Sequence, residues 1–508
     1  MLAKVLSTAL VGLEAHFIEV EVDISGGLPQ FSVVGLPDAI VRESRDRVRA
    51  ALKNTGFKFP VKKITVNLAP AGLKKEGSGL DLAIALGILA AEETVPPEAL
   101  RDCVVVGELS LDGRVKPVSG ALSIGLACRK KHPIVLPAEN AQEAAAVEGV
   151  EAYPVHTLPE TVEFLTQART ISPALINTAT LSPPLVLEED DFSEVTGQEH
   201  AKRAFEVAAA GGHNVLMIGP PGSGKTMLAR RLPGILPPMT PDEAIETTCV
   251  HSVAGLTGNG SPLMTTRPFR SPHHGISDAG LIGGGAIPRP GEVSLAHNGV
   301  LFLDEVLEFR RPVLEGLRQP LEDGSLALTR VSASVRYPAR VMLVAAMNPC
   351  PCGFYGDPKR ECLCTPHQIR RYRSRLSGPL LDRLDIHLEV PPVPIRELGN
   401  SPQEESSSTV RERVTTARQR QEVRYKKDAM VCNAQLKPRH VKKYCVIDAS
   451  GRELLEQAMT RLGLSARAYG RVLRVARTIA DLADSPDIRS EHLGEAIQYR
   501  GLDRQGDL

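Results

Sequence analysis

The sequence contains no tryptophan, and aromatic residues make up only 4% of its 508 residues. Proteins that hold single strands by stacking many bases need aromatic side chains, so contact with backbone phosphates is the more favoured mode of any nucleic-acid binding. The longest strongly apolar run, residues 82–91, spans ten residues, whereas a membrane-spanning helix needs about twenty. The sequence therefore predicts no transmembrane segment and no membrane partner.

The chain also lacks a net charge and a disulfide-type cysteine pattern. Lys plus Arg and Asp plus Glu both number 60, so any nucleic-acid surface must come from local basic patches. The cysteines number nine, and four of them crowd between residues 350 and 364, which fits a reducing compartment better than a disulfide framework. The N-terminus continues into the strand-like residues 17–23 instead of ending like a signal peptide. We therefore expect a cytoplasmic protein.

The length of the chain predicts about three domains, and the order of strand-like and helical segments predicts an α/β protein. Residues 1–165 mix alternating strands with helical stretches and form one α+β domain, and residues 166–190 are a linker with prolines and acidic residues. Residues 191–395 alternate apolar strands with helical segments, which is the pattern of a doubly wound parallel sheet. Residues 396–508 are rich in Arg and Lys at helical spacing and form a small helical domain.

Alternation and apolar runs locate the main strands of both sheets. The strands are expected at residues 17–23, 64–68, 104–109, 215–218, 300–303 and 341–344. Turn residues between alternating segments add two hairpins. These lie at residues 107–113 and 324–336.

One glycine-rich segment matches the pattern G-x-x-x-x-G-K-[ST] between an apolar strand and a helix. Its glycines allow backbone N–H groups to face phosphates at a helix N-terminus, the lysine reaches the outer phosphates and the threonine offers a hydroxyl to Mg²⁺. The segment predicts an ATP site made of Gly219, Pro220, Pro221, Gly222, Ser223, Gly224, Lys225 and Thr226.

A second element supports the same site. The apolar strand at residues 300–303 ends in Asp304 and Glu305, and two carboxylates at the end of a buried strand are costly without a function. We expect Asp304 to hold Mg²⁺ together with Thr226, and Glu305 to polarise the attacking water. The alternative is an acidic pair at a strand end that faces solvent.

From residue 191 to about residue 385, the sequence resembles AAA+ ATPases of the magnesium-chelatase and MCM-like group. The segment 192–198 resembles the part of these enzymes that borders the adenine. The resemblance implies that Asn348 is the polar sensor, Arg383 the arginine finger and Arg467 the second sensor on a helical lid. An arginine finger acts on the neighbouring subunit, so a homo-oligomeric ring, a hexamer, is implied. An ordinary salt bridge is the alternative for both arginines.

The same resemblance points to DNA as a partner. Arg330, at the turn of the second hairpin, falls where MCM-like helicases carry a DNA-contacting residue, and Arg267 and Arg270 begin a segment that resembles a pore-loop insertion. Residues 359–383 hold seven basic and two acidic residues, and residues 411–443 hold eleven and three. Such patches suit phosphate contacts without base reading. The alternative for the hairpin is a surface hairpin without a DNA contact, and the alternative for residues 411–443 is a solvated basic helix.

Four thiols follow Asn348 within a short stretch. Cys350, Cys352, Cys362 and Cys364 suit tetrahedral Zn²⁺, although the C-x-C spacing is tighter than the usual C-x-x-C. Structural zinc and reduced free thiols both remain open.

The N-terminal residues resemble a Lon-protease-like domain of the ribosomal-protein type, also found in the recombination protein RadA. The resemblance rests on residues 70–85 and 107–118. A Lon protease uses a Ser-Lys pair, and matching the segments puts Gly79 at the serine position and Leu122 at the lysine position. Both groups are missing, so we expect a non-catalytic domain and no protease activity. Ser78 with Lys74 or Lys75 is the fallback pair.

The order of these segments resembles the YifB/ComM family over nearly the whole chain. The resemblance implies an ATP-driven DNA translocase or branch-migration helicase that acts on single-stranded or branched DNA as incoming DNA is recombined during natural transformation. The first alternative is a magnesium-chelatase-type ATPase subunit or another protein-remodelling ATPase. The second is a protease-linked unfoldase, which the missing Ser-Lys pair opposes.

Overall fold

The chain folds into two compact units, each with its own sheet. In this computed structural model the described residues are 1–75, 77–175, 190–257, 262–285, 288–329, 334–357, 360–392, 404–428 and 430–501. Unit 1 comprises Met1–Ser182, Pro241–Met264 and Ala327–Tyr337; unit 2 comprises Pro183–Thr240, Thr265–Leu326 and Pro338–Leu508. Within the described ranges, every helix is too short or too polar to cross a membrane.

Unit 1 contains a seven-stranded sheet of mixed direction. The strand order is β3-β4-β2-β1-β5-β8-β9, with antiparallel pairs β1–β2 and β2–β4 and parallel pairs elsewhere. Every second residue of β2 from Ile18 to Ile24 is buried, because successive side chains of a strand point to opposite faces. The strands are β1 Leu2–Val11, β2 Glu14–Ser25, β3 Gln30–Val34, β4 Lys63–Ala69, β5 Val104–Val105, β8 Ile134–Pro137 and β9 Ala152–Val155.

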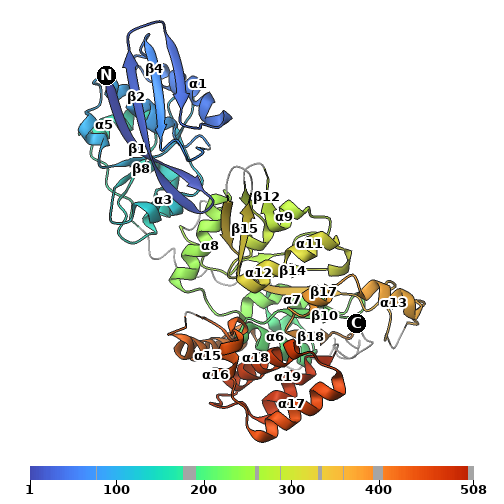
Figure 1. Cartoon of the computed structure of the whole chain (residues 1–508). Coiled ribbons are helices and arrows are strands. Elements are labelled where there is room, and N and C mark those ends of the chain that lie inside the picture. Colours follow the sequence, from blue (N-terminus) through green and yellow to red (C-terminus); the bar gives the residue numbers. More distant parts are fainter. Residues whose placement is uncertain are drawn as a thin grey trace. The chain divides into compact units, whose positions relative to one another are not determined.

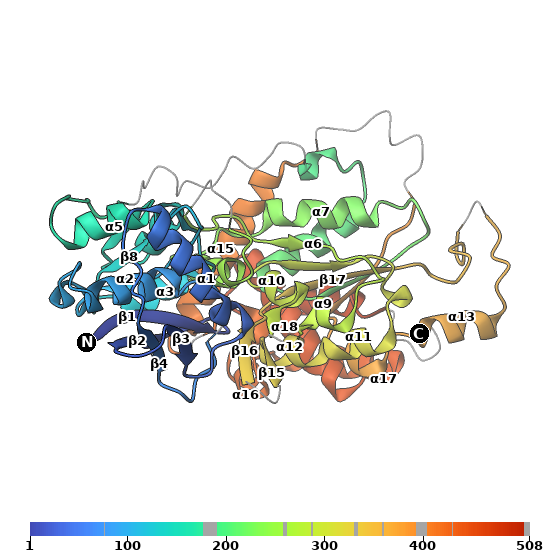
Figure 2. The same cartoon turned by 90° about the horizontal axis from the view of Figure 1, so that it is seen from above.

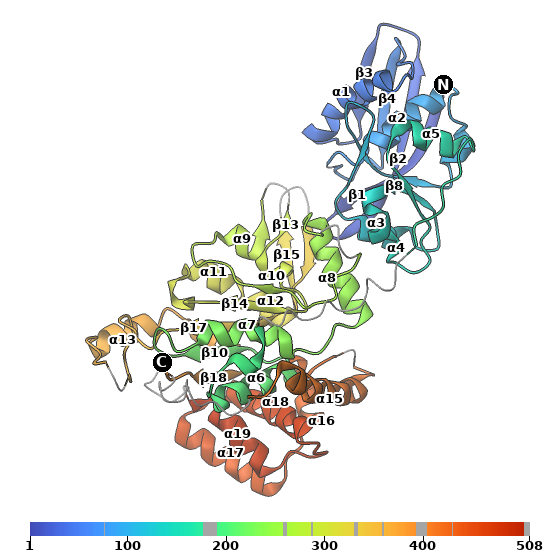
Figure 3. The same ribbon diagram turned by 180° about the vertical axis from the view of Figure 1, so that it is seen from behind.

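Helix α2, Asp81–Ala91, is buried along its whole length and lies against β1 and β2 (Figure 3). Its Gly87 allows this close approach, because a Cβ there would lie 2.6 Å from Cγ2 of Val22. The expected strand at residues 104–109 is divided: β5 ends at Val105, and β6, Glu108–Leu109, pairs with β7, Val115–Lys116, in a hairpin. The other helices are α1 Ala39–Asn54, η1 Pro97–Leu100, α3 Ala121–Cys128, α4 Ala138–Ala145, α5 Leu158–Leu165 and α8 Pro241–Val253.

Unit 2 contains the expected parallel sheet, in the order β11-β14-β17-β10-β18. Two strands keep the bounds expected from the sequence, β10 Val215–Ile218 and β14 Val300–Leu303. Alternate residues of β10 face two different hydrophobic clusters, so both faces of the sheet are covered. Helices α6 and α7 cover one face and α9, α11 and α12 the other (Figure 2). The remaining strands are β11 Phe269–Arg270, β17 Met342–Met347 and β18 Ile386–Glu389.

The helices of unit 2 fall into two sets. Those around the sheet are α6 Glu199–Gly211, α7 Lys225–Ile235, α9 Asp278–Ile282, α10 Glu292–Leu295, α11 Arg311–Gly316, α12 Arg318–Asp323, α13 Pro366–Arg373 and α14 Gly378–Leu381, with 3-10 turns η4 Phe192–Glu194 and η5 Val306–Glu308. Those at the C-terminus are α15 Ser407–Tyr425, η6 Asn433–Gln435, α16 Pro438–Tyr444, α17 Ala449–Leu462, α18 Ala466–Leu482 and α19 Ser490–Gln498.

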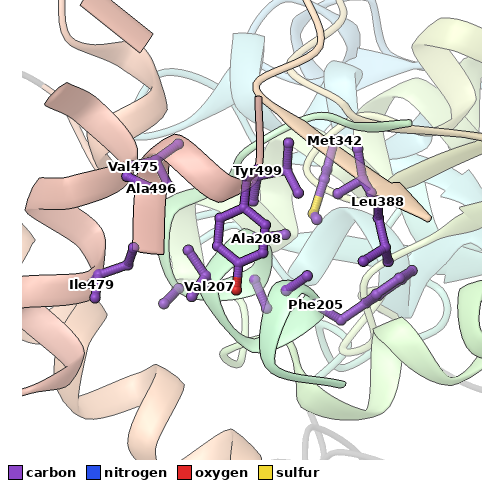
Figure 4. Packing of buried hydrophobic residues seen from close by; sticks show 14 of the residues in the cluster. Phe205, Val207, Ala208, Met342, Leu388, Val475, Ile479, Ala496 and Tyr499 are labelled. Carbon is purple, nitrogen blue, oxygen red and sulfur yellow. The ribbon is translucent and has the colours of Figure 1, made fainter. Parts of the chain in front are cut away.

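The C-terminal helices share a hydrophobic core with the parallel sheet. Val475 and Ile479 of α18 belong to the same buried cluster as Phe205 of α6 and Leu388 of β18 (Figure 4). Figure 1 shows these helices, in orange to red, gathered beside α6 and β18. The C-terminal helices therefore pack on one face of the parallel sheet.

Two small two-stranded sheets complete the described structure. One joins β12 Gly283–Gly284 to β13 Arg289–Pro290, and the other joins β15 Ser325–Thr329 to β16 Ser334–Pro338. The second is the hairpin expected at residues 324–336. Its expected DNA-contacting residue, Arg330, lies outside the described residues.

Candidate nucleotide site

The loop between β10 and α7 has the geometry of a phosphate cradle. Gly222 and Gly224 have φ values of +77° and +90°, in the left-handed region that favours glycine. A Cβ on Gly219 would lie 2.2 Å from the carbonyl oxygen of Val390, so this position also requires glycine. The buried Ser223 hydroxyl has no hydrogen-bond partner among the described residues. The loop precedes a helix N-terminus, so these features fit a bound polyphosphate.

The register of the strands brings the remaining residues of the site to the same edge. Ile218, the last residue of β10, pairs with Met347, the last residue of β17. Leu303 of β14 pairs with Ala345 of β17. Residues that directly follow these strands therefore meet at the carboxyl edge of the sheet, where α/β proteins bind ligands.

Four of the expected site residues form two hydrogen-bonded pairs there. The Thr226 hydroxyl donates a hydrogen bond of 2.7 Å to Oδ2 of Asp304. The Lys225 ammonium lies 3.4 Å from Oδ1 of Asn348, to which it donates. Hydroxyl and carboxylate oxygens in this arrangement can share a Mg²⁺ ion, and the ammonium can neutralise an outer phosphate.

Burial and nearby charges act in opposite directions on the pKa of Lys225. The side chain is 8% exposed, and burial lowers the pKa of its ammonium, while the charges of Asp304 and Glu305 act to raise it. Nζ donates hydrogen bonds of 2.6 and 2.9 Å to the carbonyl oxygens of Gly219 and Pro220. These bonds hold the lysine over the loop, in position to reach an anion.

Glu305 is presented to solvent by a left-handed backbone with φ of +49°. Its side chain is 56% exposed, and Oε2 lies 3.8 Å from Nδ1 of His274. His274 in turn packs on His273, with ring centroids 4.0 Å apart. Sequence reasoning gave His274 no role in this site. A contact between residues so distant along the chain leaves no local signal in the sequence.

The structure does not bring Arg383 and Arg467 to the phosphate loop. The Arg383 guanidinium pairs with Glu322, and Asn214, at the opposite end of β10, donates to its carbonyl oxygen. The Arg467 guanidinium lies 2.9 Å from Oδ2 of Asp382, next to Arg383. Both arginines therefore lie together at the edge of the sheet away from Lys225.

The expected DNA-binding arginines make contacts within the chain. The Arg267 guanidinium donates to the carbonyl oxygens of Pro237, Pro238 and Asn298. Arg270 donates hydrogen bonds of 2.6 and 2.7 Å to the carboxylate of Glu292. A phosphate would compete with these bonds at both positions.

Each of the two basic patches has part of its charge engaged within the chain. In the patch of residues 359–383, called the α13 patch below, Arg370 and Arg371 of α13 are exposed, and α13 itself carries no acidic residue. Three other arginines of this patch, Arg373, Arg375 and Arg383, bind a backbone carbonyl or acidic groups of the same chain. In the patch of residues 411–443, five basic side chains bind acidic groups or backbone carbonyls of the same chain. These are Arg413, Arg418, Arg420, Arg424 and Lys443. Both patches therefore keep part of their charge exposed, and in the α13 patch this exposed charge includes the adjacent Arg370 and Arg371.

The four cysteines after β17 lie together and are compatible with a zinc ion.

In unit 1, Leu122 is fully buried and its backbone N–H donates to Glu143. The Ser78 hydroxyl donates to the Glu108 carboxylate, and the Lys75 ammonium donates to the carbonyl of Pro70. Ser78 and Lys75 of the fallback pair thus each have another partner.

Comparison with known proteins places these features in a class. Residues 191–398 match the family described as magnesium chelatase, subunit ChlI; residues 20–140 match subunit ChlI of Mg-chelatase; and residues 404–500 match the C-terminal part of subunit ChlI. The fold and the site therefore define a magnesium-chelatase-like protein of the AAA+ ATPase class, a class that implies ATP and Mg²⁺ as cofactors.

Full-length relatives narrow the assignment. YifB of Salmonella typhimurium is 46% identical over 506 residues, covering 99% of this chain and 98% of the relative. Competence protein ComM of Haemophilus influenzae is 46% identical over 514 residues, with the same coverage. The magnesium-chelatase 38 kDa subunit of Rhodobacter capsulatus is 29% identical over 177 residues, covering 31% of this chain and 50% of the subunit. The chain belongs to the YifB/ComM family of magnesium-chelatase-like proteins.

Proposed function

We propose that this protein is an ATP-hydrolysing ring motor that acts on single-stranded or branched DNA, as a branch-migration helicase or translocase. The observation that carries the proposal is the contact set at the carboxyl edge of the parallel sheet, where Thr226 meets Asp304 and Lys225 meets Asn348. A full-length relative bears the name competence protein. The function requires ATP and Mg²⁺, and a structural Zn²⁺ on the four cysteines is compatible with it.

Each side chain of the site has a distinct part in this proposal. Thr226 and Asp304 hold Mg²⁺, which neutralises phosphate charge when bound. Lys225 binds the outer phosphates, Glu305 orients the attacking water and accepts its proton, and Asn348 hydrogen-bonds the group being transferred. The exposed Glu305 carboxylate is suited to this work because water can reach it directly.

The ring accounts for the residues that lie away from the phosphate loop. We propose that Arg383 completes the site of a neighbouring copy, with Arg467 and Asp382 beside it. In this account, three domains support the ring, at residues 1–165, 191–395 and 396–508. The first of them is not a protease. Arg370 and Arg371 of the α13 patch are the phosphate contacts best supported by their exposure, whereas Arg267 and Arg270 would first have to leave their partners.

The first experiment measures ATP hydrolysis by the full-length protein with and without forked DNA at two salt concentrations. We expect DNA to stimulate hydrolysis and salt to weaken the stimulation, because phosphate contacts release counterions. Arg370→Glu with Arg371→Glu should lose the stimulation and keep DNA-free hydrolysis, whereas Arg452→Glu, an exposed control on α17, should behave as wild type. Hydrolysis indifferent to every DNA would contradict the motor.

Two variants test the nucleotide site itself. Lys225→Ala should lose nucleotide binding. Glu305→Gln should keep nucleotide binding, while its ATP hydrolysis falls to the level of Lys225→Ala. Wild-type turnover by either variant would overturn the assignment.

The matches to ChlI over three segments favour a second candidate, a chelatase-type ATPase that remodels a protein partner. In that case the site variants behave as above, but hydrolysis responds to a protein and not to DNA.

A further inference from the structure

Four thiols converge in the loop that follows β17. Each of Cys350, Cys352, Cys362 and Cys364 offers a sulfur atom, and these four atoms all lie within 4.8 Å of one another. Sγ of Cys350 lies 3.3 Å from that of Cys352 and 3.6 Å from that of Cys362. The separation between Cys352 and Cys362 is also 3.6 Å.

The spacing of the sulfur atoms distinguishes among a disulfide, a single metal ion and an iron–sulfur cluster. A disulfide holds its sulfur atoms about 2.0 Å apart, so these cysteines are free thiols. A tetrahedral ion with bonds of about 2.3 Å holds its four sulfur ligands about 3.8 Å apart, close to the separations observed. An iron–sulfur cluster would hold the thiolates farther apart, because several iron and sulfide atoms would lie between them.

The backbone around the cysteines has the features of a metal loop. The N–H of Tyr355 donates to Sγ of Cys350 at 3.3 Å, and the N–H of Gly353 donates to the carbonyl of Cys350 at 3.0 Å. Backbone N–H groups that donate to sulfur stabilise thiolates and orient them toward a metal. Gly353 has a φ of +86°, which lets the chain turn back between the cysteines.

The same loop contacts the nucleotide site on two sides. Cys350 follows Asn348 by two residues, and the intervening Pro349 accepts a 3.0 Å hydrogen bond from Nε of Arg373. Gly353 packs on the phosphate loop so closely that a Cβ there would lie 2.7 Å from Cδ of Pro221. A rigid cysteine loop would therefore fix both the Asn348 amide and the outer wall of the phosphate loop.

We propose that the four cysteines bind one structural Zn²⁺ and that this ion braces the nucleotide site through Asn348 and Pro221. On binding, the thiols lose their protons to solvent and four thiolate–zinc bonds form, with no change of oxidation state. The zinc assignment stands on the thiol geometry alone, while the bracing role rests on the proposed ATPase function.

The test starts with the full-length protein purified without added metal. Elemental analysis should give about one zinc and no iron per chain. Titration of the thiols with a mercurial should release that zinc as four thiols react. Iron in place of zinc, neither metal, or release after reaction of thiols outside the cluster would overturn the assignment.

Variants test zinc binding separately from its effect on the nucleotide site. Cys362→Ser should lower zinc below about 0.2 per chain, and Cys103→Ala, a cysteine of unit 1, should keep it. ATP hydrolysis by Cys362→Ser should fall at least about tenfold. Zinc loss with wild-type hydrolysis would overturn the brace alone. If Cys362→Ser does not fold, the mercurial titration of the wild type still decides the zinc assignment. Absence of hydrolysis in the wild type would instead refute the proposed function and leave that assignment intact.

Discussion

Two neighbouring aspartates before β18 each pair with an arginine of α18, one pair buried and the other exposed. Asp385 and Arg471 are 4% and 12% exposed and lie 2.8 Å apart. Asp382 and Arg467 are 30% and 71% exposed and lie 2.9 Å apart. The buried carboxylate also lies 3.2 Å from Nδ1 of the fully buried His213. Substituting each aspartate by asparagine therefore compares the same chemistry at two depths.

The buried pair should contribute much more to stability than the exposed one. Asp385→Asn keeps the shape of the side chain but leaves the Arg471 charge without its anion, and removal of one partner from a buried pair costs about 3–5 kcal/mol. Asp382→Asn should cost no more than about 1 kcal/mol, because water already screens that pair. Burial acts to raise the pKa of the Asp385 carboxyl, but the His213 hydrogen bond and the Arg471 charge outweigh it and hold that pKa well below 3.8.

Thermal unfolding of the full-length variants measures the difference, with amide hydrogen exchange in α18 reporting on unit 2. At about 2–4 °C per kcal/mol, a loss of about 3 kcal/mol lowers the midpoint by about 6–12 °C, against at most about 4 °C for Asp382→Asn. A depressed carboxyl pKa contributes stability above its unfolded value and loses it as the pH falls. The gap between wild type and Asp385→Asn should thus be constant from pH 8 to 6 and narrow below about pH 4. Equal shifts for the two variants would refute the reasoning.

Two further predictions concern the ring and the packing of glycines. Arg383→Ala should lower ATP hydrolysis about 10³-fold with nucleotide binding intact. Mixing this variant with Glu305→Gln should restore part of the hydrolysis, since each variant supplies the residue that its neighbour lacks. No recovery in mixed rings would speak against action between subunits. Gly87→Ala should destabilise unit 1 by about 1–2 kcal/mol because of its contact with Val22. Gly470→Ala, where nothing lies within 4 Å, should stabilise its helix by about 0.5–1 kcal/mol; unfolding curves that rank the two variants the other way would contradict the packing argument.

Local sequence patterns were enough to predict the parallel sheet and its phosphate loop. The strands at residues 215–218 and 300–303 are continuous apolar runs bounded by turn residues or carboxylates, so their ends are marked in the sequence itself. The expected strand at residues 104–109 divides because Gly107 packs tightly between Val115 and Leu82 and leaves the sheet, a tertiary contact that alternation does not encode.

Long-range pairs set the limit of the sequence argument. The partners of Arg383 and Arg467, Glu322 and Asp382, follow no spacing rule along the chain. The contact of His274 with Glu305 is of the same kind. Periodicity identifies faces of helices and strands, whereas the pairing of charged groups depends on how distant segments pack.

The most direct test of the motor is movement of DNA. A forked duplex with one labelled strand would be incubated with ATP and Mg²⁺, using wild-type protein and Glu305→Gln at concentrations that bind the fork equally. We predict displacement of the labelled strand by the wild type only, because Glu305→Gln binds ATP but does not hydrolyse it. Equal displacement by both proteins, or none by a wild type that hydrolyses ATP, would contradict the account.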